Sequence, residues 1–224
     1  MKDFKKLNNI IGWLVFLIAT SVYLATMEKT ASLWDCGEFI AAAYKLEVVH
    51  APGAPLFLMM GRIFSLFASD STQVAVMVNS MSALASSFTI LFLFWTITAF
   101  GRKIYSKQGK IEMGKIYAIL GAGIVGSLAY TFSDSFWFSA VEGEVYALSS
   151  LFTAVTFWCI LKWEEVADSP RSSKWLILIA YLIGLSIGVH LLSLLTIPAM
   201  GIIFWLRNPS KATYTIPKLS LIHI

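Results

Sequence analysis

Charged side chains are scarce in this chain: they make up 13% of its 224 residues, while hydrophobic residues make up 58%. An ordinary soluble domain carries about twice that share of charge, and a soluble core of this size could not bury so much apolar surface. The few charges are also bunched, because they leave five uncharged runs at residues 7–27, 71–101, 116–133, 145–161 and 175–206. About 20 apolar residues cross a membrane as a helix, so the sequence predicts an all-α polytopic membrane protein.

Cysteine is also scarce, since the chain has only Cys36 and Cys159. Cys159 lies inside an apolar run and Cys36 lies outside one, so no disulfide is expected. The net charge of +4 comes from basic residues in short loops, which is typical of topology signals and excludes a nucleic-acid partner. The first apolar run is too long for a signal-peptide core and no small-residue cleavage site follows it, so we interpret it as a retained first span.

The apolar runs predict six membrane-embedded helices within a transmembrane region at 1–206, at about residues 9–27, 75–100, 116–133, 145–161, 175–189 and 191–206. Residues 28–72 are predicted to form an outer loop with interfacial helices. This topology puts all 17 basic residues except Lys29, Lys45 and Arg62 on the cytoplasmic side, with the N-terminus. The run 175–206 is long for one crossing, and a break near His190 would make it a hairpin. Residues 207–224 are expected to be a cytoplasmic, possibly truncated tail.

Two acidic segments on the predicted outer side, residues 32–57 and 133–148, are the candidate site. Asp35 and Glu38 are three residues apart and share one face of a helix, while Glu142 and Glu144 lie among aromatic residues. Carboxylates at a membrane surface among aromatic rings are typical of a site where an acid or base meets a lipid-borne or sugar substrate. The candidate catalytic residues are Asp35 and Glu38, and the candidate substrate-binding residues are His50, Arg62, Glu142, Glu144, Tyr146 and His190. The pattern indicates no cofactor and no metal.

Each candidate has a structural alternative. Ser32 and Asp35 match a capping box, in which Asp35 would only hold a helix N-terminus. Glu142 and Glu144 fit a solvated loop, Arg62 fits a snorkelling side chain, and His190 fits a helix-end histidine. The GAGIVG stretch at 121–126 fits the dinucleotide fingerprint, but it lies in an apolar span without a preceding strand. There, small residues would instead let two helices approach closely.

The stretch WDCGEFIAAAYKLEVVHAPGAPLF, residues 34–57, resembles the first-loop motif of the family called domain of unknown function 2723. That family includes bacterial membrane proteins and an animal transmembrane O-mannosyltransferase. Its aspartate, Gly-Glu and His-Pro-Pro-Gly elements match here, with Ala51 in place of the first proline; the matching residues are Asp35, Gly37, Glu38, His50, Pro52 and Gly53. FWFSAVEGEVYALSSLF and GLSIGVHLLSLLTIPA resemble the family's second outer segment and the following hairpin. The resemblance implies a GT-C glycosyltransferase bundle with a polyprenyl-phosphate sugar donor, in a chain longer than this one.

Together these features predict a membrane glycosyltransferase that moves a sugar from a polyprenyl-phosphate donor to a hydroxyl of a protein or glycan. The active side would be periplasmic, in a bacterial inner membrane. We expect Asp35 to act as general base, with Glu38 orienting it or the acceptor, and Arg62, His50 and His190 to face the leaving phosphate. The alternative is a multi-pass transporter or lipid flippase, although transporters usually place ionisable residues near the membrane midplane.

Overall fold

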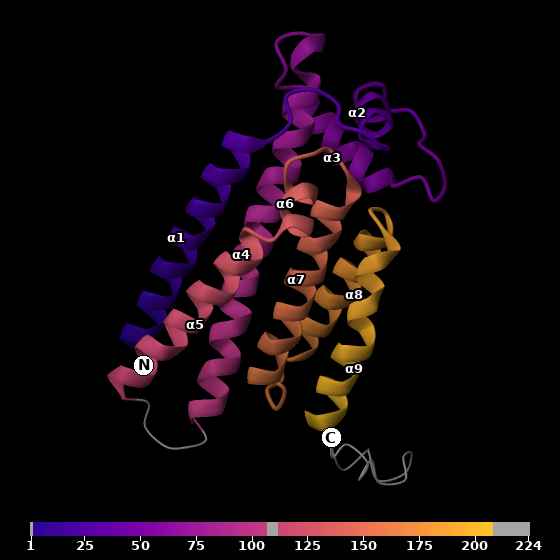
Figure 1. Cartoon of the computed structure of the whole chain (residues 1–224). Helices are drawn as coiled ribbons and strands as arrows, with labels where there is room; N and C mark the ends of the chain where they lie inside the picture. Colours follow the sequence, from indigo (N-terminus) through magenta and orange to yellow (C-terminus); the bar gives the residue numbers. More distant parts are fainter. Residues whose placement is uncertain (1, 107–111, 208–224) are drawn as a thin grey trace, which may run out of the picture.

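A computed structural model of the chain describes residues 2–106 and 112–207, and over these residues it is helical, without strands. Four helices are long and apolar enough to cross a membrane: α1 (Lys2–Thr26), α4 (Val74–Ser106), α5 (Met113–Thr131) and α7 (Val145–Glu165). They run side by side along the bundle (Figure 1). The predicted all-α membrane bundle is therefore confirmed, and the chain is an integral membrane protein.

Shorter elements complete the described part of the chain. At one end of the bundle lie α2 (Cys36–Lys45), α3 (Pro55–Ser65) and α6 (Asp134–Ala140), with the 3-10 turn η1 (Ser71–Gln73) before α4 (Figure 1). A hairpin of α8 (Ser173–Ile187) and α9 (Thr196–Arg207) packs beside α7, with the 3-10 turn η2 (Leu191–Leu195) between its arms.

The helices extend past the apolar runs from which their positions were predicted. The predicted spans at 75–100 and 145–161 lie within α4, which continues to Ser106, and α7, which continues to Glu165. Hydrophobicity marks where a segment meets lipid, whereas backbone hydrogen bonding continues for as long as the residues accept helical geometry. The turn at 188–190 separates two helices shorter than a comfortable crossing. Membrane placement of the six segments stays a prediction, and the tail at 208–224 lies outside the described residues.

α4 is the central helix, because α1, α5 and α7 all pack against it. Small residues allow these close contacts, as the GAGIVG stretch of α5 shows. A Cβ added at Gly123 would lie 2.7 Å from Thr98 Cγ2, and one at Gly126 would lie 2.8 Å from Ile97 Cδ1, both on α4. Gly123 and Gly126 therefore allow α5 to pack closely against α4.

The segment 28–72 is packed onto the end of the bundle by a core of its own. Phe57 of α3 and Ala43 of α2 are fully buried with Val78 of α4. A Cβ at Gly61 would lie 2.9 Å from Ala43 Cβ, so α2 and α3 are in close contact. Leu56 N–H also donates to the Gly188 carbonyl at 2.7 Å, which ties the start of α3 to the turn after α8. The segment is thus a fixed platform that can position side chains.

Candidate functional site

The two acidic segments meet at this platform although 75 residues, 58–132, separate them along the chain. The Glu28 N–H donates to the Val141 carbonyl at 2.9 Å, which brings the chain after α1 alongside the loop before α7. Ser32 Oγ then donates to a carboxylate oxygen of Glu142. Residues 28–35 and 141–144 therefore form one surface above α4.

Asn79, fully buried in α4, fixes this junction from below. Its Nδ2 donates to the carbonyls of Glu28 at 2.7 Å and Thr30 at 3.1 Å. Gly143 lies against the same side chain, since a Cβ there would be 2.8 Å from Asn79 Oδ1. Asn79 was given no role from the sequence; the available signal was an amide side chain within a long apolar helix.

Asp35 stands at the N-cap position of α2, but its side chain makes no capping hydrogen bond. Its backbone is helical, with φ −82° and ψ −4°, whereas a capping residue is usually extended so that its side chain can reach back to the first turn. Ser32 bonds to Glu142 instead. The capping-box alternative is therefore wrong. The Asp35 side chain is 57% exposed, so an acceptor hydroxyl can reach it.

Glu38, in the first turn of α2, holds His50 through two hydrogen bonds. Its carboxylate accepts the His50 backbone N–H at 2.7 Å and lies 2.8 Å from ring Nδ1. The other ring nitrogen, Nε2, then lies 3.9 Å from Asp35 Oδ2. The three residues form a row, which we call the Asp35–His50–Glu38 row. Gly53, with φ +96°, supplies a turn conformation that side chains disfavour just after His50.

Charge interactions in this row raise the pKa of His50 and lower the pKa of Glu38. The hydrogen bond between them is the main cause in both cases, and the Asp35 charge raises the His50 pKa further. His50 therefore keeps a positive charge to a higher pH than an isolated histidine would. The row presents a carboxylate and a cation side by side to solvent.

Glu142 and Glu144 are buried, with exposed fractions of 2% and 7%. Burial raises the pKa of both carboxyl groups, that of Glu144 to about 7, and the charges of Glu142 and Asp35 add to the Glu144 shift. The solvated-loop alternative is therefore wrong. Buried acids with raised pKa values beside a row of ionisable groups are typical of functional sites.

The remaining predicted residues lie at two other places. The Tyr146 and His190 rings are 5.4 Å apart, and His190 Nδ1 accepts the Leu192 N–H at 3.1 Å. His190 therefore caps the start of η2, as the helix-end alternative predicted. Among the described residues, only Nδ1 of its two ring nitrogens takes part in a hydrogen bond. The structure thus places His190 against Tyr146, which lies two residues after Glu144.

Arg62 is held at the far end of α2. Its Nη1 donates to the Tyr44 carbonyl at 2.6 Å, and its guanidinium lies 5.5 Å from the centre of the Tyr44 ring. Nine residues of helix, about 13 Å, separate Tyr44 from Asp35. In the described part of the chain, Arg62 contacts neither the Asp35–His50–Glu38 row nor the buried acids Glu142 and Glu144.

The Asp35–His50–Glu38 row could also hold a metal ion, because each residue offers a ligand atom within 4.8 Å of the others. Two carboxylates and an imidazole fit a divalent cation such as Zn²⁺ or Mn²⁺. Glu38 is already committed to His50 Nδ1, so an ion would fit best between Asp35 and His50 Nε2.

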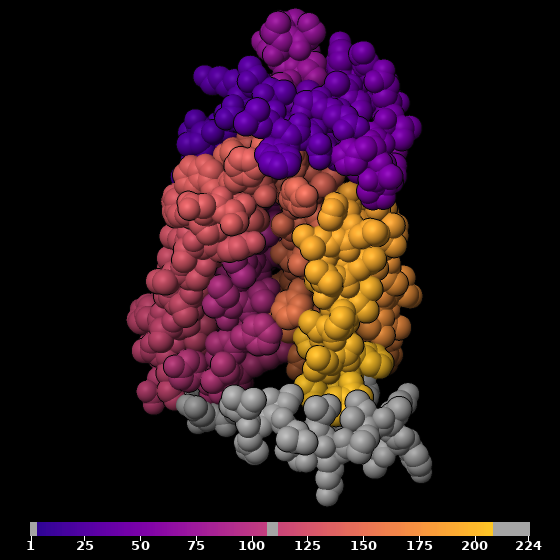
Figure 2. Space-filling view, turned by 45° about the vertical axis from the view of Figure 1, so that its right-hand side comes forward, coloured from indigo at the N-terminus to yellow at the C-terminus, as the bar shows by residue number. Residues whose placement is uncertain are grey.

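A groove of about 720 Å³ lies in the membrane-spanning part of the bundle, between α4, α5, α7 and η2. Figure 2 shows the recess on the face between α5 and α9. Its walls are mostly apolar, with the hydroxyls of Thr89, Ser149, Ser150 and Thr153 among them. Two of its lining residues are close in sequence to the acidic end: Ser149 to Glu144, and Leu192 to His190. The groove therefore approaches the acidic end from the lipid side.

These features define a helical membrane protein with an ionisable site on a packed platform at one end of the bundle. Residues 35–213 match the family model described as the Protein O-mannosyl-transferase TMEM260 N-terminal domain. The chain belongs to that family, and the matched region includes every predicted site residue. The label expected from the sequence, domain of unknown function 2723, is not tested by this match and stays a prediction.

Two relatives extend the comparison. A Dictyostelium discoideum protein named Protein O-mannosyl-transferase tmem260 is 27% identical over 204 residues, which is 86% of this chain and 23% of the relative. The Mus musculus Protein O-mannosyl-transferase TMEM260 is 29% identical over 174 residues, 77% of this chain and 22% of the relative. This chain thus spans less than a quarter of either relative's length. No solved structure matches it. Both relatives are eukaryotic, so a bacterial inner-membrane location stays a prediction.

Proposed function

We propose that this chain carries the acidic site of a membrane glycosyltransferase that moves a sugar from a polyprenyl-phosphate carrier to a hydroxyl of a protein. The observation that carries the proposal is the Asp35–His50–Glu38 row beside the buried Glu142 and Glu144, within the region that matches the family. The names of the two relatives support mannose as the sugar and a protein as the acceptor.

In the proposed reaction, Asp35 removes the proton of the acceptor hydroxyl as its oxygen attacks the anomeric carbon. The bond from that carbon to the carrier phosphate breaks, and the polyprenyl phosphate leaves with the electron pair. Positive charge develops on the sugar ring in such a transition state, so nearby carboxylates stabilise it. His50, held by Glu38, keeps a cation beside Asp35 and orients its carboxylate. Positioned bases of this kind contribute about 10²–10⁴-fold to the rate.

The groove supports a lipid-borne donor. Its mostly apolar lining between α4, α5 and α7 suits an isoprenoid chain. At the acidic end, His190 keeps Nε2 free of hydrogen bonds to described residues, because its bond to Leu192 uses Nδ1. The imidazole could therefore meet the carrier phosphate there, with Tyr146 packed against it. Arg62, which is bound to the Tyr44 carbonyl, is given no role toward the carrier phosphate.

The test is sugar transfer by the full-length protein with Asp35→Asn. The amide keeps the shape of the side chain but accepts no proton at neutral pH, so transfer should fall by at least about 10²-fold. Thermal stability should stay near wild type, since Asp35 makes no capping bond. Asp134→Asn, an exposed aspartate at the start of α6, is the matched control and should keep normal transfer. Near-normal transfer by Asp35→Asn would remove Asp35 from the role of base.

A further inference from the structure

A second cavity lies at the opposite end of the bundle from the acidic site. It measures about 330 Å³ and is enclosed by the first turns of α1 and the last turns of α4 and α7. We call it the basic pocket, after the residues that line it.

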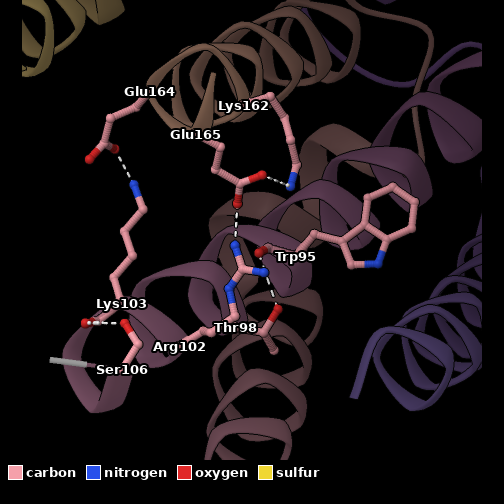
Figure 3. Close-up of polar contacts among 8 residues, drawn as sticks. All are labelled: Trp95, Thr98, Arg102, Lys103, Ser106, Lys162, Glu164 and Glu165. Atoms are coloured by element: carbon pink, nitrogen blue, oxygen red, sulfur yellow. Dashed lines mark hydrogen bonds and ion pairs between the residues drawn. The ribbon is translucent and has the colours of Figure 1, made fainter. Parts of the chain in front are cut away.

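Three cations and one carboxylate line the basic pocket: Lys5, Arg102 and Lys162, with Glu165. Glu165 accepts from Arg102 and lies 3.1 Å from Lys162 Nζ, so one carboxylate is shared between two cations (Figure 3). Lys5 is exposed and forms no ion pair with any described residue. The pocket therefore has a surplus of positive charge that an anion would balance.

The indole rings of the lining indicate where the pocket lies relative to the membrane. Asn8 Oδ1 and Trp95 Nε1 are buried without a hydrogen-bond partner in the described part of the chain, but Oδ1 is an acceptor and Nε1 lies against Gly12 of α1. The indication of an anionic ligand therefore rests on the cations of the lining. Trp95 and Trp158 both line the pocket, and tryptophan is enriched where a membrane meets water.

We propose that the basic pocket binds a phosphate group, and that an anionic phospholipid supplies it. The chemistry of recognition is that of a phosphate among Lys5, Arg102 and Lys162. The source follows from the position between the ends of three apolar helices, where an acyl chain can run along Phe4, Ala99 and Trp158. Basic pockets between transmembrane helices commonly bind lipid head groups. The bound lipid would join α1 to α7 across α4.

The experiment measures lipid binding by the full-length protein in neutral detergent, using native mass spectrometry with phosphatidylglycerol, phosphatidylcholine or inorganic phosphate. Lys5→Gln removes an unpaired cation from the pocket and should weaken phosphatidylglycerol binding about fivefold. Lys6→Gln is the matched control: it makes the same charge change at an exposed neighbour outside the lining, and binding should stay within about twofold. Lys5→Glu should weaken binding further than Lys5→Gln. Melting temperatures of all variants should match wild type, because neither lysine forms an ion pair with a described residue.

Three results would overturn the proposal. Equal losses in the Lys5 and Lys6 variants would mean that surface charge, not the pocket, attracts the lipid. Phosphatidylcholine binding as strong as phosphatidylglycerol would mean that the lipid's net charge is not recognised. Inorganic phosphate that binds with the same dependence on Lys5 and displaces the lipid would make free phosphate the ligand. None of these readouts depends on sugar transfer, so they are independent of the proposed function.

Discussion

The two ends of this bundle differ in how their carboxylates are paired, although Glu38 and Glu47 at the acidic end also lie near a basic side chain. At the basic end, Glu164 accepts from Lys103, Glu165 accepts from Arg102, and Asp168 accepts from Arg207. At the acidic end, Glu142 and Glu144 are buried close to each other, and neither takes part in an ion pair with a described residue. Burying an unpaired carboxylate is unfavourable, and such groups are concentrated at functional sites. The ion pairs of the basic end therefore hold helices together, whereas the buried acids mark the end that holds a site.

Glu144 should give the largest effect on stability. Its pKa in the folded state is about 7, above its ordinary 4.5, so folding favours the protonated form. Ionisation then costs stability progressively as pH rises from about 4.5 to 7, by about 3 kcal/mol at most. Glu144→Gln removes that cost, and the melting temperature at pH 8 should rise by several degrees while it changes little at pH 5.

The control for this prediction is Glu47→Gln, which removes an exposed carboxylate of the same end that lies 3.9 Å from Lys45. It should shift the melting temperature little at either pH. If Glu144→Gln were destabilising to the same extent at both pH values, Glu144 would be an ordinary ionised side chain and the contrast between the ends would be lost.

Gly143→Ala tests how tightly the acidic end is packed. The new Cβ would lie 2.8 Å from Asn79 Oδ1 and 3.1 Å from Val78 Cγ1. Asn79 cannot move away cheaply, because two backbone carbonyls accept from its amide. We expect a loss of about 2 kcal/mol in thermal or denaturant unfolding. Gly121→Ala, where a Cβ meets no atom within 4 Å, is the control and should leave stability unchanged or slightly higher.

Glu38→Gln should have a moderate effect, on activity and not on stability. The amide can still accept one hydrogen bond but no longer stabilises a charged His50, so the His50 pKa should fall. We expect sugar transfer by the full-length protein to drop about tenfold. The decline of activity on the alkaline side should move to lower pH, because His50 loses its charge earlier. An unchanged pH profile would show that the charge on His50 has no part in transfer.

Much of the fold followed from the sequence, because the apolar runs are long and separated by bunched charges. A break was expected near His190, and a turn there separates α8 from η2 and α9. The outer position of the segment 28–72 stays a prediction. Helix ends were not predictable, since α4 and α7 continue through Arg102, Lys103 and Lys162. Pairing between Lys103 and Glu164 across two helices stabilises those extensions, and no local pattern reports such a contact.

The candidate site was predicted in outline from residue type and position. The pairing of Asp35 with Glu38 was a local inference from their spacing. Asp35 is the N-cap residue of α2, Glu38 lies in its first turn, and both carboxylates lie near the His50 ring, while their roles stay predictions. The Glu38–His50 contact and the burial of Glu142 depend on how α2, the turn at 50–54 and the loop at 141–144 pack. Arg62 was predicted to face the donor phosphate. Among the described residues its guanidinium donates to the Tyr44 carbonyl at the C-terminal end of α2, and its role toward a donor stays a prediction.

The smallest effect belongs to the basic end. The Lys103 and Glu164 side chains are 27% and 32% exposed, so water and salt screen their attraction, and pairs of this kind contribute about 0.2–1 kcal/mol. A double-mutant cycle of Lys103→Gln and Glu164→Gln should give a coupling in that range, smaller at 0.5 M salt than at 0.05 M. Lys115 forms no ion pair with Glu164 in the described part of the chain, so Lys115→Gln combined with Glu164→Gln should show no coupling. A Lys103–Glu164 coupling above about 2 kcal/mol that salt leaves unchanged would place a desolvated charge pair at this end too. Unfavourable burial of charge would then no longer distinguish the acidic end, and the assignment of the site would rest on the family match and the Asp35–His50–Glu38 row alone.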